Sequence, residues 1–558
     1  MPVIESVSWI IAVLTVAFCG SSLGNSNGAN DVSNSYATAI ASGTLSFKQA
    51  GALAIITEFI GAVALGGKVT EKIKSGVINI HHFDRSPAVL VLVMGCVEFG
   101  TAAWLTIATS FGLPVSTTQT VVACLSGVGL ASGASLKWGW KGKGLSTIAA
   151  AWVISPLLAL IVAGIIQSLI NIAVLNRKNP YECAKRLMPC FFAATCTLFP
   201  VFILTELLGK QSVQHFGIAR FATPIVATFF GMLFLAYFFG LPYCIRLLDD
   251  NKQDARLRLI HLPMGPLLLR KDPPYYLPSK TLANISPTET KAIARPTLSP
   301  NQSGHTSRAE SGDLPPAIPC EALVAACVTP MTAREKYLDP TSDLPFYKPA
   351  RAWSWAKYVF LHGVSQDCVT FDSAQVTEAH QHSRMHDQKV ERIWKPLLML
   401  AAALMSIAHG SNDVANAVGP WVAAYQTWKN GAILDDAESP VWIIVVAAIL
   451  IGVGFWFFGY KIVRSLGNKI THISPTRGYV INVASSITVL LASRFGLPVS
   501  TTQCQLGATI GVGLCSLSTK AVNWKQIGFI ILGWIITIPI AGLIAGLLMG
   551  MGLNTPHL

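Results

Sequence analysis

Long apolar runs follow one another along the chain, separated by short polar connectors and by one long polar segment. Each run has about the 20 residues that an α-helix needs to cross the hydrocarbon core of a bilayer. The pattern predicts about twelve membrane-spanning helices, near 8–24, 46–66, 87–108, 111–133, 147–173, 188–207, 222–245, 395–424, 440–459, 477–493, 497–517 and 527–552. We therefore expect an all-α integral membrane protein with a first span that is retained.

The long polar segment divides the chain into three parts. Residues 1–245 form a first membrane block, 246–394 an intervening segment and 395–558 a second membrane block. The middle part, called the insert below, is rich in Ser, Thr and Pro between Thr281 and Pro316, a composition that favours disorder. We expect a large loop outside the membrane, with much of 275–350 disordered and a helix leading into the second block.

Composition supports the membrane class. Of the 558 residues, 52% are hydrophobic and only 12% are charged, which is not the composition of a soluble domain. The net charge of +13 does not indicate nucleic acid, because basic residues stand in short connectors such as Lys461, Arg464 and Lys469. There they contact lipid headgroups and set the orientation of the chain. The cysteines show no metal-binding spacing.

Two short polar motifs each occur twice. GANDVSN begins at Gly28 and GSNDVAN at Gly410, whereas GLPVSTTQ begins at Gly112 and again at Gly496. The separations, 382 and 384 residues, nearly agree, so the chain contains two repeats with the same internal order. Seven predicted spans separate the copies, and an odd number reverses direction across the membrane. The repeats are therefore expected to be inverted around one central site, with broken or re-entrant helices where the motifs fall.

The first motif places a carboxylate at membrane depth in each repeat. An ionised aspartate there costs at least about 2.5 kcal/mol, so Asp31 and Asp413 should face a cavity, a cation or a partner. Asn34 and Asn416 follow three residues later, on the same helix face. The neighbouring glycines favour an interrupted helix, whose free carbonyl oxygens would join these side chains in a sodium site. The alternative is a polar contact between helices.

The second motif predicts a helix start that can hold an anion. Pro114 and Pro498 suit a first helical turn, and hydroxyl groups follow at once, in Ser116, Thr117 and Thr118 and in Ser500, Thr501 and Thr502. Helix starts present free amides and a positive dipole end. Two such starts from inverted repeats would grip one tetrahedral oxyanion. The alternative is an ordinary capped helix start in each repeat.

Charge then favours coupled transport. Two ionised aspartates and a phosphate cannot share a site of low dielectric constant unless cations enter with them. Sodium or protons would supply that positive charge, and a protein that carries them together with the anion is a symporter. The sequence has no P-loop to indicate ATP drive, and it shows no nucleophile–base pair or metal cluster that would indicate an enzyme.

Together these motifs resemble the PiT family of inorganic phosphate transporters, and more closely its fungal sodium–phosphate symporter branch. The resemblance implies twelve spans in two inverted repeats, phosphate as substrate and sodium, less often protons, as the coupling ion. It implies that the serines and threonines of the second motif bind phosphate, and that Asp31 and Asp413, with Asn30 and Asn412 before them, coordinate ions and phosphate.

The same resemblance marks Glu58 as a glutamate needed for transport, and it places Gln119 and Gln503 where histidine is frequent. Some relatives carry a second glutamate where this chain has Asn482. We count Glu58 and the two glutamines with the coupling residues of the site.

The sequence thus predicts a plasma-membrane importer of inorganic phosphate, driven by sodium or protons, with no cofactor. The insert is expected in the cytoplasm and both termini outside, and a homodimer is compatible with the sequence. Two alternatives stay open: transport of another tetrahedral oxyanion, and a transporter-like receptor that senses phosphate.

Overall fold

The described residues are almost wholly helical. The computed structural model describes residues 14–15, 18, 26–65, 76–140, 144–248, 259–269, 333–363, 366, 368, 374–434, 439–494, 499–516 and 518–554. Within these ranges the only β-pairing is an isolated bridge between Ile78 and Leu136. The expected all-α class is therefore confirmed.

The helices fall in the order that the apolar runs predict. The first block contains α2 (Asn27–Asn30), α3 (Val32–Ala41), α4 (Phe47–Leu65), α6 (Pro87–Ser110), α7 (Thr117–Ser132), α8 (Leu145–Ile170), α9 (Pro180–Phe216), α10 (Ile218–Leu235) and α11 (Leu241–Leu248). The insert contributes α13 (Ala333–Tyr337), α14 (Pro349–Leu361) and α15 (Ala374–Gln381). The second block contains α16 (Gln388–Asn430), α17 (Val441–Leu466), α18 (Pro475–Arg494), α19 (Thr501–Leu514) and α20 (Trp524–Asn554).

Eight of the described helices are long and apolar enough to cross a membrane, namely α4, α6, α8, α9, α10, α16, α17 and α20. The other four expected spans differ. The run at 8–24 lies almost wholly outside the described residues. α18 is less apolar than the eight. α7 and α19 have only 16 and 14 residues, too few for the roughly 20 that a full crossing requires.

α6 and α7 form a hairpin that begins and ends on one face of the molecule. Ile78 before α6 pairs with Leu136 after α7, and Lys137 N donates to Val77 O at 2.9 Å. α18 and α19 form the equivalent hairpin, because Arg477 Nη2 at the start of α18 donates to Ser516 Oγ beyond α19 at 3.0 Å. The two short helices therefore return to the face from which their hairpins start.

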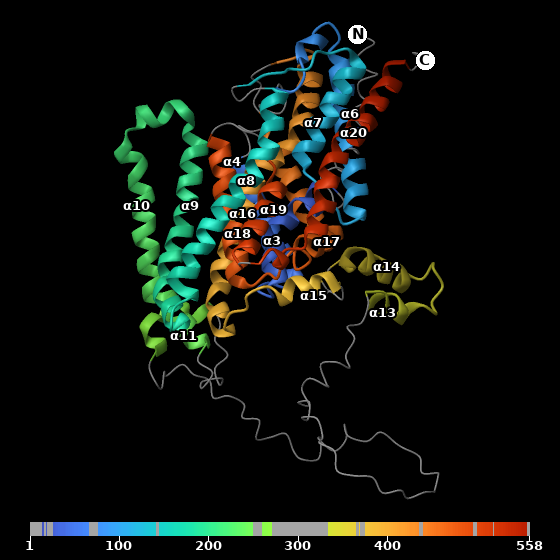
Figure 1. Cartoon of the computed structure of the whole chain (residues 1–558). Helices are drawn as coiled ribbons and strands as arrows, with labels where there is room; N and C mark the ends of the chain where they lie inside the picture. The colour runs from blue at the N-terminus through green and yellow to red at the C-terminus, as the bar shows by residue number, and fades with distance from the viewer. Residues whose placement is uncertain are drawn as a thin grey trace, which may run out of the picture.

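The two repeats run in opposite directions. α3 ends where α16 begins, since Lys395 Nζ donates to Gly43 O at 3.2 Å. Asn468, just after α17, donates to Ala41 O at 3.0 Å. The ends of α3 and α17 therefore share a face with the start of α16, and α3 is antiparallel to α16. Figure 1 shows the insert at this face, which we call the insert side. The geometry agrees with the expected inversion.

The glycines of the first motif serve close helix packing. A Cβ on Gly28 would collide with the carbonyl oxygen of Ile451 in α17, and one on Gly410 would lie 2.6 Å from Glu58 O in α4. The helix is interrupted at Asp31, between α2 and α3, as expected. α16, however, is continuous through Gly410. The expected interruption is thus wrong in the second repeat, where the glycine admits a neighbouring backbone instead.

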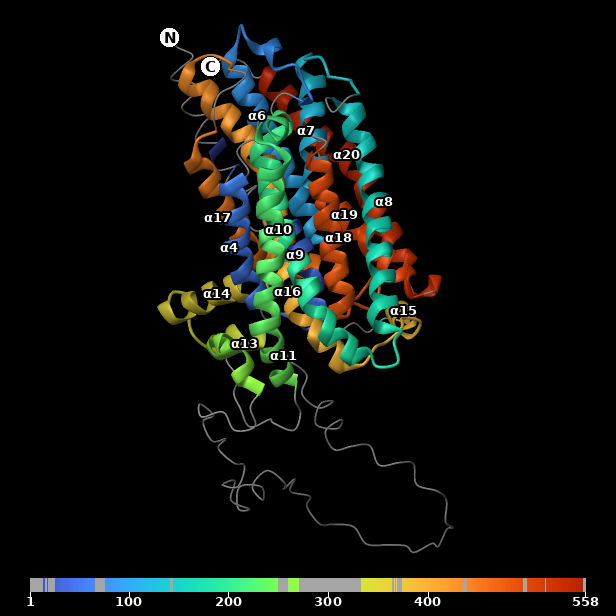
Figure 2. The ribbon, with the colours of Figure 1, turned by 90° about the vertical axis from the view of Figure 1, so that its left-hand side faces the viewer.

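α9 and α10 form an outer hairpin beside this core. α10 packs on α9; it stands at the left edge of the molecule in Figure 1 and in front of the core in Figure 2. Its outward side chains include Phe230 and Phe234, exposed by 63% and 61%, which is the character of a lipid-facing helix. α9 joins the core through Phe191, whose ring lies 5.2 Å from that of Trp394.

The folded end of the insert lies against the core. α13 to α15 gather below the membrane helices, on the insert side (Figure 1). A turn at 382–387 separates α15 from α16. Asp387, at the end of this turn, caps the start of α16 by accepting from Lys389 N at 2.9 Å. Of the stretch expected to be disordered, 275–332 lies outside the described residues, whereas 333–350 forms α13 and turns.

Candidate functional site

The two aspartates of the repeats meet the two hydroxyl-rich helix starts at the centre of the core. The Thr117 hydroxyl donates to Asp31 Oδ2, and the Thr501 hydroxyl donates to Asp413 Oδ2 at 2.8 Å. Thr117 and Thr501 hold the same place in their motifs, as do the aspartates. Each repeat therefore forms the same threonine–aspartate hydrogen bond.

The asparagines cross from one repeat to the other. Asn34 Nδ2 donates to Thr502 Oγ1 at 2.7 Å, and Asn416 Nδ2 donates to Thr118 Oγ1 at 3.0 Å. The two bonds are equivalent under exchange of the repeats, since Asn34 corresponds to Asn416 and Thr118 to Thr502. The four motif copies thus form one pseudo-symmetric site, and each half of it contains groups from both repeats.

This site is closed to solvent on every side. Thr118 and Asp413 are 5% exposed, and the other six members, Asp31, Asn34, Thr117, Asn416, Thr501 and Thr502, are 2% exposed or less. Asp413 is also bonded on its second oxygen, which accepts from Asn416 at 3.0 Å and from Thr118 at 3.3 Å. Buried polar groups of this density are stable only when paired. The structure therefore represents an occluded arrangement.

The serines of the second motif cap their helices. Ser116 Oγ accepts from Gln119 N at 3.1 Å, and Ser500 Oγ accepts from Gln503 N at 3.4 Å. The capped-start alternative thus describes the serines, whereas the threonines after them face the aspartates. Both helix starts point their positive ends at the carboxylates, which lowers the free energy of negative charge there.

Asn30 and Asn412 hold equivalent places in sequence but different places in structure. Asn30 ties α2 to the turn before α7, since its amide donates to Leu113 O at 3.1 Å and its oxygen accepts from Val115 N at 3.2 Å. Asn412 donates to Ala408 O of its own helix at 3.1 Å. Asn30 thus positions the turn that leads to the threonines of α7.

Glu58 joins the site through a histidine that the sequence analysis did not select. Glu58 Oε2 lies 2.8 Å from His409 Nδ1, and its other oxygen accepts from Ser406 at 2.6 Å. The far nitrogen of the ring, Nε2, lies 3.4 Å from Asp413 Oδ2 and 4.0 Å from Asp31 Oδ2. Three buried carboxylates thus surround one imidazole.

In the sequence, His409 is distinguished by a difference between the two repeats. The histidine stands directly before the second copy of the first motif, and Asn27 stands directly before the first copy. His409 has no counterpart in the first repeat, so repetition of the motifs does not mark it. Gln119 and Gln503 are 3% and 1% exposed, and their Oε1 atoms have no hydrogen-bond partner among the described residues.

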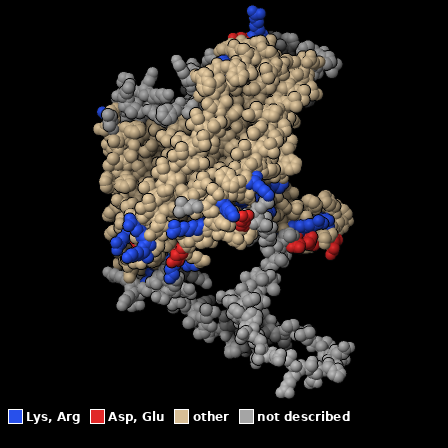
Figure 3. All heavy atoms as spheres, viewed as in Figure 1, with Lys and Arg blue, Asp and Glu red and all other residues tan. Residues whose placement is uncertain are grey.

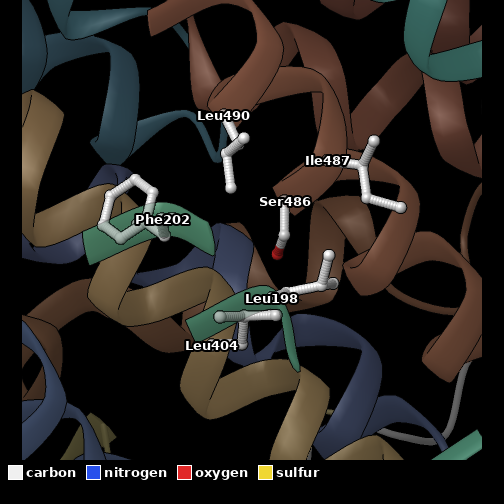
Figure 4. Close-up of a pocket in the computed structure, with 7 residues that line it drawn as sticks. Leu198, Phe202, Leu404, Ser486, Ile487 and Leu490 are labelled. Atoms are coloured by element: carbon white, nitrogen blue, oxygen red, sulfur yellow. The ribbon is translucent and has the colours of Figure 1, made fainter. Parts of the chain in front are cut away.

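A small void lies beside the site but is not part of it. It measures about 10 Å³ and is enclosed by α9, α16 and α18, with Leu198, Leu404 and Leu490 among its lining residues (Figure 4). Ser486 is the one polar side chain there, and its hydroxyl donates to Asn482 O at 2.8 Å. Since such a volume holds at most about one water molecule, the void cannot admit an oxyanion.

Comparison with known proteins identifies the family. Residues 27–545 match the family described as the phosphate transporter family. The chain belongs to the phosphate transporter family. This is a family of transporters, not of enzymes, as the sequence predicted.

Relatives of this transporter are similar over nearly their whole length. It is 34% identical to the phosphate-repressible phosphate permease pho-4 of Neurospora crassa, over 95% of each chain. It is 28% identical to the sodium-dependent phosphate transporter 1-A of Danio rerio, over 93% of this chain and 91% of the relative. A solved structure entitled "The sodium-dependent phosphate transporter" shares the fold, with a TM-score of 0.62, 21% identity and full coverage of both chains.

In this transporter, Asn482 and Gln505 form a neutral pair of side-chain amides. Asn482 Oδ1 accepts from Gln505 Nε2 at 2.9 Å, and Asn482 Nδ2 donates to Ser35 O at 3.2 Å. Asn482 therefore links α18 to α3 with neutral groups. The charge of the site is carried by the first repeat's Glu58, the two aspartates and His409.

Proposed function

We propose that this protein imports inorganic phosphate across the plasma membrane by symport with sodium. The observation that carries the proposal is the closed network in which threonines from two helix starts donate to the two aspartates. Threonine hydroxyls and helix starts are suited to a phosphate, and aspartate oxygens are suited to a hard cation such as sodium.

The names of the relatives support both ions. The Danio rerio protein and a Mus musculus relative, 26% identical over 94% of this chain, are called sodium-dependent phosphate transporters. The Neurospora crassa relative is called a phosphate permease. We infer the same pair of ions for this chain, with sodium placed at Asp31 and Asp413.

The threonine–aspartate contacts supply a physical reason for coupling. A hydroxyl has one proton to donate, so Thr501 cannot donate to Asp413 and to a phosphate oxygen at the same time. When sodium neutralises the aspartate, the carboxylate no longer needs that donor. The hydroxyl can then turn to phosphate, and the same holds for Thr117 and Asp31. Sodium should therefore raise the affinity for phosphate, and phosphate the affinity for sodium by the same factor.

The charges of the site also require cations. Glu58, Asp31 and Asp413 bring three carboxylates, against the single imidazole of His409. A phosphate adds further negative charge in a region from which water is excluded, and unpaired charges there are very unfavourable. Entry of at least one sodium ion with each phosphate offsets this repulsion. Protons on the carboxylates would do the same, which makes protons the competing coupling ion.

The two hairpins provide a route for alternating access. α6–α7 and α18–α19 enter from opposite faces, and the helix starts at their inner ends meet at the site. Movement of one hairpin opens the site to one face only, while the other hairpin keeps it closed to the opposite face. Such motion of repeats around a fixed central site is the usual mechanism of transporters with inverted repeats.

We propose that the insert side is cytoplasmic and that both termini are outside. In Figure 3 the charged side chains of the visible face gather at the lower, insert end, below a broad band without charge. In the sequence, basic residues stand between α8 and α9 (Arg177 and Lys178), in the first turns of α9 (Arg186) and near the end of α17 (Lys461 and Arg464). An excess of Lys and Arg in short loops marks the cytoplasmic side.

The test is uptake of labelled phosphate by purified full-length protein in proteoliposomes. An inward sodium gradient should drive uptake above the level seen with potassium at both pH 6 and pH 7.5. A proton gradient without sodium should not replace it. Sulfate in excess should compete weakly, and arsenate, which has the charge and size of phosphate, should compete strongly.

Three results would count against the proposal. Uptake that does not depend on either ion gradient would exclude coupling. Uptake driven by a proton gradient alone would make protons, not sodium, the coupling ion. Uptake of sulfate at the same rate as phosphate would show that the site does not select phosphate. Light scattering on the purified protein in detergent gives its molar mass, which tests whether the chain forms a homodimer.

A further inference from the structure

A second cavity lies on the insert side, apart from the central site. It has a volume of about 610 Å³ and lies between the end of α3, α15, the turn before α16 and the segment that precedes α18. Its lining includes His380, Arg384, His386, Glu391 and His472. Volumes of 300–1,000 Å³ are typical of sites for small molecules. This cavity is therefore large enough for a ligand bigger than orthophosphate.

Arg477 holds the two sides of this cavity together. One of its terminal nitrogens donates to His472 O at 2.9 Å, and the other donates to Arg384 O at 2.8 Å. It thereby joins the segment before α18 to the turn before α16, and at 4% exposure its charge is buried behind the cavity wall. These acceptors are neutral, so they satisfy the hydrogen-bonding capacity of the guanidinium without neutralising it.

Positive groups predominate around the cavity. Several charged or titratable groups face the cavity or lie directly behind its wall. They are His380 from α15, Arg384, His386 and Asp387 from the turn, Glu391 and Lys395 from α16, His472 and Lys469 from the segment after α17, Arg477 from α18 and Cys515 after α19. Both acids hold hydrogen bonds through one oxygen, and the charge of Glu391 also acts on Arg477. Asp387 caps α16, and Glu391 Oε2 accepts from Thr476 N at 2.9 Å and from Thr476 Oγ1 at 2.8 Å. Within the described part of the chain, Arg384 forms no ion pair.

The histidines respond to this excess of positive charge. Burial, and then the charges of Arg477 and Arg384, lower the pKa of His386 from 6.5 to about 4. Burial, Arg477 and His380 lower the pKa of His472 to about 4 as well. An anion between them would offset the repulsion and raise both pKa values. His386 and His472 are therefore two groups whose protonation a bound anion would favour.

We propose that this cavity binds a multivalent phosphate anion, either a free condensed phosphate or the phosphorylated headgroup of a lipid, at a site separate from the transport site. Arg384 supplies a fixed charge and Arg477 a buried one, while His386 and His472 supply donors that can take up a proton. The ligand would contact α15 and the turn before α16 together with the ends of α3 and α17. It would thus connect the insert to both membrane blocks.

The test uses the full chain in nanodiscs of phosphatidylcholine, titrated with inorganic tripolyphosphate in a calorimeter. We expect one site per chain, proton uptake on binding, and affinity that rises as pH falls from 7.5 to 6. The rise is at most about tenfold per pH unit for each proton taken up. Arg384→Ala should weaken binding roughly tenfold or more. Lys348→Ala, which removes a charge from the start of α14, should not.

Separate arms identify the source of the phosphate and the independence of the site. In nanodiscs that contain a phosphoinositide, a lipid ligand would compete with tripolyphosphate in the wild type but not in Arg384→Ala. Asp413→Asn should bind tripolyphosphate normally even if it no longer transports phosphate, because the inference does not rest on the proposed function. His386→Gln should reduce proton uptake on binding. This second variant tests the site if Arg384→Ala is unstable.

The inference is overturned if neither tripolyphosphate nor the phosphoinositide binds, or if binding is the same in Arg384→Ala and wild type. Loss of binding in Asp413→Asn would also overturn it, because the anion would then occupy the transport site. Binding without proton uptake would show that the histidines do not take up a proton with the anion, contrary to the inference.

Discussion

Asp413→Asn changes the centre of the site with almost no change in shape. Asp413 Oδ2 accepts from Thr501 at 2.8 Å, and Oδ1 accepts from Asn416 at 3.0 Å. An asparagine retains one acceptor oxygen and replaces the other by an NH₂ group. If the NH₂ faces Asn416, two amide donors meet; if it faces Thr501, the hydroxyl must accept a hydrogen bond instead of donating one. The substitution also removes the negative charge assigned to sodium.

The size of the effect follows from the bonds that are lost. A hydrogen bond to a charged group contributes about 1.5–3 kcal/mol, and at least two such bonds to Asp413 are weakened or broken. The total of about 3–6 kcal/mol corresponds to a loss of roughly 10²–10⁴-fold, at 1.36 kcal/mol per factor of ten. We therefore expect sodium-driven phosphate uptake by Asp413→Asn to fall below about 1% of the wild-type rate.

The assay is the initial rate of labelled phosphate uptake in proteoliposomes, divided by the amount of folded protein recovered from gel filtration. Asp84→Asn is the matched control, since Asp84 undergoes the same chemical change in the connector before α6 with its side chain 54% exposed. It should transport like wild type. If Asp413→Asn keeps more than about a tenth of the wild-type rate, the aspartate is not the sodium ligand of a coupled site.

Three further results are expected. Thr501→Ala should raise the phosphate concentration for half-maximal uptake about tenfold or more, while Thr501→Ser, which keeps the hydroxyl, should not; equal values for both would exclude the hydroxyl. Gly410→Ala should lower the melting temperature, because its Cβ would lie 2.6 Å from Glu58 O and overpacking of this kind costs about 1–3 kcal/mol. Gly164→Ala, with no atom within 4 Å of the added Cβ, should not lower it; the same loss in both would point to helix propensity or lipid. Because burial and nearby positive charge lower the pKa of His472 from 6.5 to about 4, the unfolded chain binds its proton first and stability falls as pH drops through this interval. His472→Gln should therefore lose less melting temperature than wild type between pH 7 and pH 5, and an unchanged loss would mean that His472 is not the group responsible.

Repetition made the centre of the site predictable from sequence. A polar motif within an apolar run is informative because unpaired polar groups are costly in a membrane. The second copies of Asp31 and Thr117 showed which of these groups belong together. The exchange of partners was not predictable. Asn34 and Thr502 are separated by 468 residues, and no local pattern shows that an amide of one repeat reaches the hydroxyl of the other.

The same reliance on repetition explains what the sequence analysis missed. Glu58 was selected from a family resemblance, but its partner His409 was not, because the first repeat has Asn27 in that place. The continuous course of α16 through Gly410 was missed for a related reason. A glycine permits both an unwound helix and the close approach of two helices, and only the position of Glu58 O shows that the second applies.

The asymmetry of the site matters as much as its symmetry. The Thr–Asp bonds and the bonds between Asn and Thr of opposite repeats recur under exchange of the halves. Asp413 also accepts from Asn416 and Thr118, whereas Asp31 Oδ1 has no hydrogen-bond partner among the described residues. The Glu58–His409 pair does not repeat, and its imidazole lies 3.4 Å from Asp413 Oδ2 but 4.0 Å from Asp31 Oδ2. Because electrostatic interaction falls with distance and is strong where water is excluded, the two carboxylates experience different potentials. The cation positions of this transporter are therefore expected to differ in affinity, and Asp31, which lies farther from the imidazole, should hold its cation more tightly.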